Sequence, residues 1–322
     1  MRSFKSILKT IIPLSIGVFF IYLSFKSTTA EDRIRIVTYF KSADIRFLLL
    51  SILFAFLSHI SRAYRWQFLL QPMGYQPKLY NSILAVLVAY LANLGVPRSG
   101  EIFRATTMTT YEKIPFEKGF GTIITERIID LLLLAFSVII ALFLQFDMIY
   151  TYLVQKKIEL PILLIGAVLF LSIVVVVRHQ LKISHNSIVL KIKYFLSGLL
   201  EGILSIKKMP KKAWFVAHTI FIWTMYFAMF CVVKWCLPET TNLTFSALFP
   251  AFVVGGLTIS ATNGGIGIYP YAVGMVLTAF DISTEAGFAF GWIMWSAQTL
   301  MILIFGGLSF FVLPLLNSKK EL

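Results

Sequence analysis

The sequence contains few cysteines, histidines and acidic residues. Its 322 residues include two cysteines and four histidines, and 15 acidic residues stand against 29 basic ones. Cys231 and Cys236 share one apolar run with no histidine or acid at metal-ligand spacing, and the histidines form no spaced set. We therefore expect two buried thiols and no metal site.

Motifs of soluble catalysis are also missing. No P-loop, hydrolase nucleophile elbow or dinucleotide-binding glycine pattern stands between a strand and a helix. The chain has no sizeable polar segment outside its apolar runs. The sequence therefore predicts no cofactor and no soluble catalytic domain.

Long apolar runs dominate instead. Apolar residues make up 58% of the chain and the mean hydropathy is +0.83, which is far above globular usage. Several runs are long enough to span a bilayer. The net charge of +14 lies between these runs, where basic residues orient a membrane chain and meet anionic lipid, so we do not expect nucleic-acid binding. The runs cover residues 7–25, 47–60, 79–97, 119–146, 160–177, 213–237, 245–261, 268–280 and 287–315.

The distribution of basic residues predicts the topology. Residues 178–213 carry eight Lys or Arg against the single Glu201, so this segment should be cytoplasmic, as should both termini. No Lys or Arg occurs between Lys234 and Lys319, so the loops there should lie outside. Five full spans before residue 178 would place the basic segment outside. A hairpin at 79–111 that enters and leaves on the cytoplasmic side corrects this.

Helix-breaking residues interrupt the same segment and recur in the second half. They are Asn93, Gly95, Pro97 and Gly100, and then Asn263, Gly264, Gly265, Gly267 and Pro270. Broken apolar segments at matching places in two halves are typical of transporters built from inverted repeats. We therefore predict an all-α polytopic integral membrane protein with repeats at residues 1–150 and 151–322. It would have about six full spans plus two broken re-entrant hairpins, or about eight spans.

Charged residues lie where the membrane is expected. Glu126, Arg127 and Asp130 fall within an apolar run, where each central charge costs about 2.5–3.5 kcal/mol. They should pair with basic partners, and Arg98 and Arg104 flank Glu101 at a spacing that puts all three on one helix face. The cluster either binds a lipid phosphate through its arginines or only holds the hairpin in place.

A further basic and aromatic group follows the second run. It consists of Arg62, Arg65 and Trp66. Arg and Trp at the end of a span are typical of anchors at the membrane interface, so we expect these three side chains there.

Taken together, these motifs resemble those of the lysylphosphatidylglycerol synthase transmembrane-region family, also called flippase-like domain proteins. They are Arg62-Ala-Tyr-Arg-Trp66, Asn93-Leu-Gly-Val-Pro-Arg-Ser-Gly-Glu101 with Arg104, Glu126-Arg-Ile-Ile-Asp130 and Asn263-Gly-Gly-Ile-Gly267. The resemblance implies lipid translocation, with the head group passing Arg98, Glu101, Arg104, Glu126, Arg127 and Asp130. Tyr269-Pro270-Tyr271 replaces an acidic residue that is typical of the family.

The expected function is therefore a non-enzymatic, flippase-like transporter in the cell membrane. Its ligand would be an anionic phospholipid or a polyprenyl-linked lipid. The alternative is a membrane-embedded enzyme, or a membrane subunit of a separate synthase or transferase, that acts on a lipid phosphate.

Overall fold

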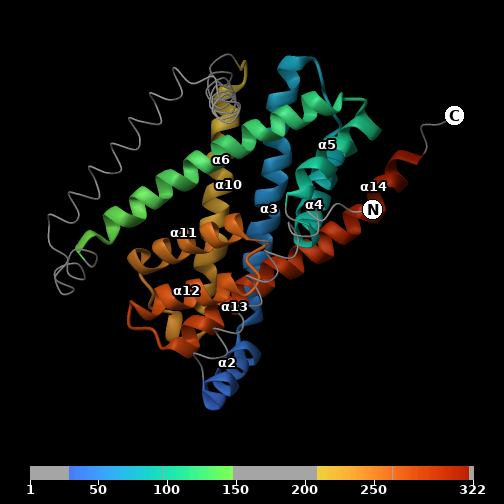
Figure 1. Ribbon diagram of the computed structural model, residues 1–322. Coiled ribbons are helices and arrows are strands. Elements are labelled where there is room, and N and C mark those ends of the chain that lie inside the picture. The colour runs from blue at the N-terminus through green and yellow to red at the C-terminus, as the bar shows by residue number, and fades with distance from the viewer. Residues whose placement is uncertain (1–28, 97, 148–208, 263, 319–322) are drawn as a thin grey trace, which may run out of the picture. The chain divides into compact units, whose positions relative to one another are not determined.

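The computed structural model describes residues 29–96, 98–147, 209–262 and 264–318 (Figure 1). All regular elements in these ranges are helices, which confirms the predicted all-α class for this part of the chain. The helices are α2 (Ala30–Ser42), α3 (Ile45–Leu70), α4 (Leu79–Gly95), α5 (Ser99–Glu112), α6 (Phe116–Leu144), α10 (Lys212–Val232), α11 (Phe245–Ala261), α12 (Ile268–Thr278), α13 (Thr284–Met301) and α14 (Gly307–Asn317).

Four helical stretches in the described part of the chain are long and apolar enough to cross a membrane: Ile45–Met73, Phe116–Leu144, Lys212–Cys236 and Thr284–Asn317. The protein is thus a polytopic membrane protein. The predicted runs at 7–25 and 160–177, and most of the basic segment 178–213, lie outside the described residues. The total number of spans therefore stays a prediction.

The chain divides into two compact units. One comprises residues 1–126 and 209–322, and the other comprises residues 127–208. The predicted repeat boundary near residue 150 concerns internal symmetry and not compact units, so it stays a prediction. The site described below is built within the first unit.

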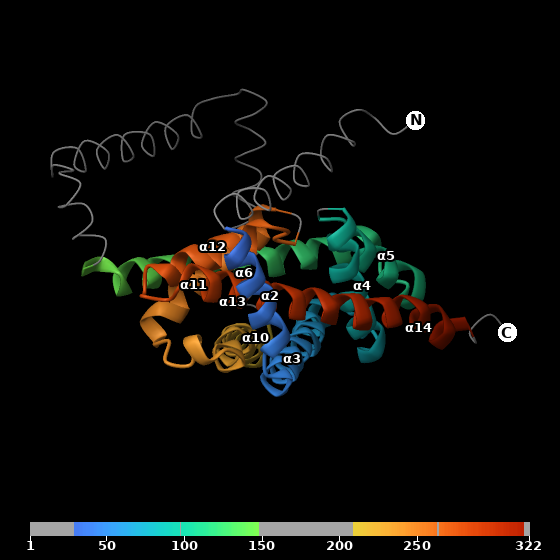
Figure 2. The same ribbon diagram turned by 90° about the horizontal axis from the view of Figure 1, so that it is seen from below.

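Helices α3 and α10 pack along each other in the first unit (Figures 1 and 2). Two small hydroxyls link them: Ser51 Oγ donates to the carbonyl of Met229 at 2.8 Å, and Ser61 Oγ lies 2.8 Å from His218 Nδ1. Interhelical hydrogen bonds of this kind stabilise membrane helices, because lipid offers no hydrophobic force between them.

Two pairs of short helices form hairpins, α4 with α5 and α11 with α12. The second pair packs closely on α13 at two glycines. A Cβ at Gly291 would lie 2.6 Å from the Pro270 carbonyl oxygen, and one at Gly274 would meet the Phe288 ring. Small residues here allow the helix backbones to approach, as is common in membrane bundles.

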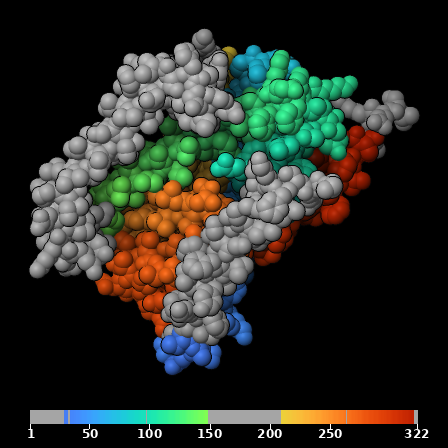
Figure 3. Space-filling view, viewed as in Figure 1, coloured from blue at the N-terminus to red at the C-terminus, as the bar shows by residue number. Residues whose placement is uncertain are grey.

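A π-helical segment, Ile302–Gly306, joins α13 to α14. Gly306 faces α4, since a Cβ there would lie 2.8 Å from Leu91 Cβ and 2.9 Å from the Leu87 carbonyl oxygen. Beyond this contact α14 continues past α4 and α5, and Figure 3 shows the α5 surface in blue-green beside the α14 surface in red. The three helices α4, α5 and α14 thus form one corner of the unit.

Candidate functional site

The connection between α4 and α5 is short and hydrogen-bonded. Helix α4 ends at Gly95, and Asn93 Oδ1 accepts a hydrogen bond from the backbone N–H of Gly100 at 2.8 Å. Ser99 Oγ donates to the carbonyl of Ala92 at 2.9 Å. A Cβ at Gly100 would lie 2.0 Å from the Ala89 carbonyl oxygen, so only glycine allows this approach. The sequence break therefore sets a tight turn and a fixed start for α5. Pro97 lies outside the described residues.

A buried ion cluster lies where α3, α5 and α6 meet. The carboxylate of Glu126 is completely buried and contacts two arginines. Arg104 Nη1 lies 2.6 Å from Glu126 Oε2, and Arg65 Nε donates to Glu126 Oε1 at 3.3 Å. Arg65 is completely buried and Arg104 is 2% exposed. One carboxylate thus joins the hairpin helix α5 to the span α3.

Aromatic and hydroxyl groups complete this cluster. The Arg104 guanidinium carbon lies 3.7 Å from the centre of the Trp66 ring, which is stacking distance for a cation on an aromatic face. Trp66 Nε1 donates to Thr122 Oγ1 at 2.8 Å, and Arg65 Nη1 donates to Thr219 Oγ1 at 3.1 Å. These contacts fix both guanidinium groups in the protein interior.

A second polar network lies about one helical turn along α3. Arg62 is 2% exposed, and its Nη2 donates to the Tyr226 hydroxyl at 3.1 Å. The Tyr226 hydroxyl lies 3.2 Å from that of Tyr90, whose ring centre is 4.1 Å from that of His59. Helices α3, α4 and α10 are therefore linked by polar side chains as well as by apolar packing.

The structure brings together only some of the predicted site residues. Glu126 and Arg104 pair, as the sequence led us to expect. Arg98 differs from expectation: it precedes the first residue of α5, has a φ of 60°, and its side chain is exposed. It therefore cannot share a helix face with Glu101 and Arg104. Glu101, in the first turn of α5, is partly buried.

Arg127 and Asp130 belong to the second unit. Arg127 Nη1 lies 3.8 Å from Asp130 Oδ2, so these two residues pair with each other one turn apart on α6. This contact is longer than those in the Glu126 cluster.

The sequence predicts interface anchors at the protein surface for Arg62, Arg65 and Trp66, but the structure does not place them there. All three are buried, and two of them supply the Glu126 cluster. Their spacing carried a signal for this, because positions 62, 65 and 66 lie on one face of a helix. Thr122 and Thr219, which complete the cluster, gave no signal in the sequence.

The second hairpin connection contains no charged residue. Gly264, Gly265 and Gly267 adopt φ values of 66°, 74° and 72°, which side chains other than glycine rarely tolerate. Trp295 Nε1 donates to the carbonyl of Gly264 at 2.8 Å, and this bond holds the connection against α13. Pro270 lies in the first turn of α12. Asn263 lies outside the described residues.

The cluster is suited to holding an acidic oxygen ligand. A guanidinium group binds carboxylate and phosphate with the same planar pair of N–H donors. Among the described residues, no group of three or more His, Cys, Asp or Glu side chains is placed to hold a metal ion.

Comparison with known proteins places this chain in a family. Residues 10–306 match the family of the lysylphosphatidylglycerol synthase TM region. Over 99 residues the chain is 27% identical to the UPF0104 membrane protein MJ1595 of Methanocaldococcus jannaschii, an alignment that covers 30% of each protein. No solved structure matches the chain significantly. Because the family match extends over most of the sequence, this membrane protein belongs to the lysylphosphatidylglycerol synthase TM-region family.

Proposed function

We propose that this protein moves an anionic or isoprenoid-linked lipid between the two leaflets of the cell membrane and does not itself carry out catalysis. The observation that carries the proposal is the buried cluster of Arg65, Arg104 and Glu126 in an apolar helical protein. Ionisable groups are costly at membrane depth and are commonly retained for function. Membership of a family named for a lipid synthase supports a lipid as the ligand.

The mechanism follows from the position of Arg104. This residue lies on α5, the returning helix of the hairpin, and its partner Glu126 occupies the place that a phosphate group would take. Because the side chains of Arg104 and Glu126 are buried, a head group reaches Arg104 only when α5 moves away from Glu126. The lipid phosphate then replaces the carboxylate, and closure of the hairpin releases it.

Two further predicted residues extend the path within the first unit. We place Glu101 and Arg98 at its entrance, since Glu101 is partly buried and Arg98 is exposed. The complete fold in this proposal has two re-entrant hairpins in an inverted repeat, with both termini in the cytoplasm, and its partner is the membrane lipid.

Lipid exchange in vesicles tests the proposal. The purified chain is reconstituted with fluorescent phosphatidylglycerol, or with a labelled polyprenyl phosphate, and the label in the outer leaflet is destroyed chemically over time. We expect more than half of the label to become reachable with the protein, against about half in empty vesicles. Exchange no faster than in empty vesicles for every lipid would rule out the proposal.

A matched pair of variants separates the cluster from the fold. Glu126→Gln keeps a hydrogen-bonding group beside the arginines, while Glu117→Gln changes an exposed residue of the same helix. We expect the first variant to slow exchange and the second to leave it unchanged. Chemical conversion of the lipid, lost in Glu126→Gln, would instead indicate an enzyme.

A further inference from the structure

The helical stretch Thr284–Asn317 connects the two hairpins of the first unit. It has 34 residues, which at 1.5 Å per residue make about 50 Å, more than the hydrocarbon core of about 30 Å requires. Its first part, α13, packs on α12, and its last part, α14, packs on α4. Between them lies the π-helical segment Ile302–Gly306. Single π-helical turns inside α-helices are rare and occur frequently at functional sites.

Helix α13 is fixed to the α11–α12 hairpin by close backbone packing. A Cβ at Gly287 would lie 2.9 Å from the Gly274 carbonyl oxygen, and this contact adds to the close packing at Gly291. Trp295 Nε1 also donates to the carbonyl of Gly264, just before α12. Backbones that meet at glycines cannot slide past each other without a change in the backbone itself. Helices α11, α12 and α13 therefore form one body.

Helix α14 is fixed to α4 at both of its ends. Just before α14 begins, Gly306 packs directly against the backbone of Leu87. At the far end of α14, Asn317 Nδ2 donates to Asn81 Oδ1 at 2.8 Å, and Asn81 Nδ2 donates in return to Asn317 Oδ1 at 3.1 Å. The two contacts hold α14 along the length of α4.

The α4–α5 hairpin is itself closed at both ends. The side chains of Asn93 and Ser99 join the two helices at their connection. At the opposite end, Asn81 Nδ2 donates to Glu112 Oε1 at 2.5 Å, and the backbone N–H of Lys78 donates to the same oxygen at 3.2 Å. Helices α4 and α5 therefore move together if they move at all, and α14 goes with them.

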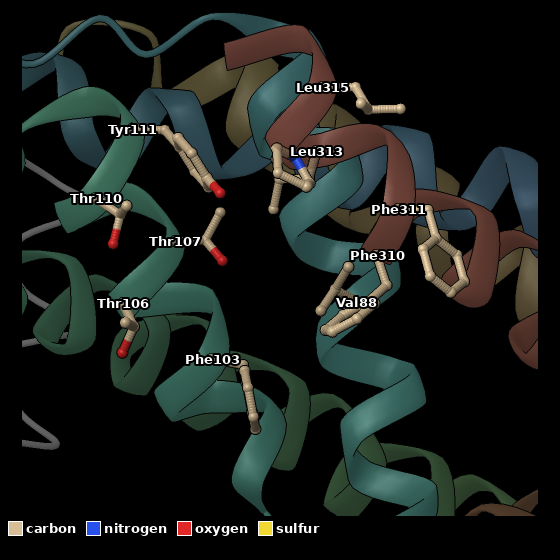
Figure 4. Close-up of a pocket in the computed structure, with 11 residues that line it drawn as sticks. Val88, Phe103, Thr106, Thr107, Thr110, Tyr111, Phe310, Phe311, Leu313 and Leu315 are labelled. Carbon is tan, nitrogen blue, oxygen red and sulfur yellow. The ribbon is translucent and has the colours of Figure 1, made fainter. Parts of the chain in front are cut away.

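A pocket of about 530 Å³ separates the middle of α14 from α5 (Figure 4). Thr107 and Tyr111 of α5 line one side, and Phe310 and Leu313 of α14 line the other, with Val88 of α4 between them in the chain. The connection of α14 to the hairpin therefore depends on α4 and on the asparagine pair at the end of α14.

The polar contacts between the hairpin and its other neighbours are made by the ends of long side chains. Arg104 reaches Glu126 of α6 and the Trp66 ring of α3. The Tyr90 hydroxyl of α4 lies 3.2 Å from the Tyr226 hydroxyl of α10. Such side chains change rotamer and exchange partners without moving a backbone. These contacts can therefore open, whereas the glycine contacts of α13 cannot.

The connecting stretch changes neighbours within its π-helical segment. The ring centre of Phe305 lies 4.6 Å from that of Phe56 on α3, and the next residue, Gly306, packs on α4. Gly307 follows, and a Cβ there would meet nothing within 4 Å. Because two glycines adjoin a turn that departs from the α-helical hydrogen-bond pattern, the helix bends more easily here than on either side.

We propose that residues 302–307 are a hinge on which α4, α5 and α14 swing as one body away from α3, the first part of α6 and the body of α11, α12 and α13. The motion separates Arg104 from Glu126 and opens the ion cluster. This inference rests on the proposed function, because it supplies the opening step of that mechanism. It also makes α14 part of the moving body.

Distances between spin labels test the hinge. The two native cysteines are replaced by alanine, and cysteines are introduced in pairs at the exposed positions Ile102 of α5, Leu316 of α14 and Met275 of α12. The labelled chain is reconstituted in vesicles. In the Glu126→Gln variant, which weakens the pairing that closes the cluster, both distances from Met275 should gain a second population. The distance from Ile102 to Leu316 should keep one population.

Gly307→Ala and Gly121→Ala are a matched pair for the hinge. Both add a methyl group in open space to a helical glycine, but Gly121 lies in α6, outside the hinge. In the Glu126→Gln background, we expect Gly307→Ala to reduce the second population about fivefold, because alanine favours a regular helix. Gly121→Ala should leave that population unchanged.

Two results would overturn the hinge. One is an equal second population in Gly307→Ala and Gly121→Ala. The other is a change in the distance from Ile102 to Leu316 while the distance from Leu316 to Met275 stays constant, because α14 would then remain with α12.

Lipid exchange in the same vesicles keeps the hinge and the proposed function distinguishable. Two distance populations without lipid exchange by the wild type would support the hinge and contradict lipid translocation. Exchange by the wild type, with one population for every label pair in Glu126→Gln, would support translocation and contradict the hinge.

Discussion

The two hairpins of this protein share a shape and differ in chemistry. The pair α4–α5 is joined to its surroundings by charge, through the contact of Arg104 with Glu126. The pair α11–α12 has no charged residue and is joined to its surroundings by close backbone approach, at Gly274 and Gly291.

This difference separates a part suited to movement from a part suited to support. An ion pair can exchange one acidic partner for another without leaving a gap, since carboxylate and phosphate are alike to a guanidinium. Packed glycines have no such alternative, because the contact depends on the absence of a side chain. In the proposed function, ligand handling therefore belongs to α4–α5, and α11–α12 has a supporting role.

Loss of the shared carboxylate should have the largest effect on stability. Glu126→Ala leaves the guanidinium groups of Arg65 and Arg104 buried without it, and we expect a loss of about 3–5 kcal/mol in the free energy of unfolding. Thermal unfolding in detergent measures this change. Glu117→Ala, at an exposed position of α6, is the control. Equal melting temperatures for the two variants would show that the ion cluster does not hold the α4–α5 hairpin.

The second-largest loss of stability should come from overpacking at the second hairpin, α11–α12. Gly291→Ala places a Cβ 2.6 Å from the Pro270 carbonyl oxygen, and relief requires backbone movement. We expect a loss of about 1–3 kcal/mol. Gly307→Ala adds its methyl group in open space and should be neutral or slightly stabilising. If Gly291→Ala unfolds at the wild-type temperature, close packing is not what holds α12.

Trp66→Phe should have a smaller effect on the first hairpin. The substitution removes the indole N–H donated to Thr122 and leaves a smaller ring beneath Arg104. We expect a loss of about 1 kcal/mol in stability, with slower lipid exchange because Arg104 is less well oriented. Unfolding and exchange are measured on the same preparation. Unchanged exchange would show that the stacking only supports the fold.

The smallest effect should lie outside both hairpins, at the start of α3. Hydrogen bonds from Arg46 lower the pKa of Asp44, whose side chain also caps the helix. Because the folded pKa is depressed, this contribution to stability is present above the unfolded pKa of about 3.9 and is lost as the pH falls through the folded value. Melting curves at pH 6 and pH 3 should therefore differ more for the wild type than for Asp44→Asn. Equal shifts in melting temperature for the two proteins would contradict a stabilising role of the Asp44 carboxylate.

The sequence was sufficient for the features that depend on local chemistry. The helix breaks near Asn93 and Asn263 follow from Gly, Pro and Asn in apolar runs, and the pairing of Glu126 with Arg104 follows from the cost of a charge in lipid. The spacing of Arg62, Arg65 and Trp66 put Arg65 on a shared helix face, but it did not decide its burial, because an arginine at the end of a span is compatible with both a surface and an interior.

Tertiary packing decided the remaining features. Arg98 left the expected helix face because α5 begins at Ser99, and single residues at helix ends are the least predictable part of a pattern. The packing of Gly306 against Leu91 of α4 joins residues that lie far apart in sequence. No local pattern carries that information.

The most direct measurement compares Arg104→Lys with Arg65→Lys in the lipid-exchange assay. Both arginines contact the same Glu126 carboxylate, but only Arg104 lies on the hairpin. Lysine keeps the charge and loses the planar donor pair that suits phosphate. We predict that Arg104→Lys slows exchange by about tenfold or more relative to Arg65→Lys at similar thermal stability. Equal exchange rates in the two variants would contradict the assignment of lipid handling to α4–α5.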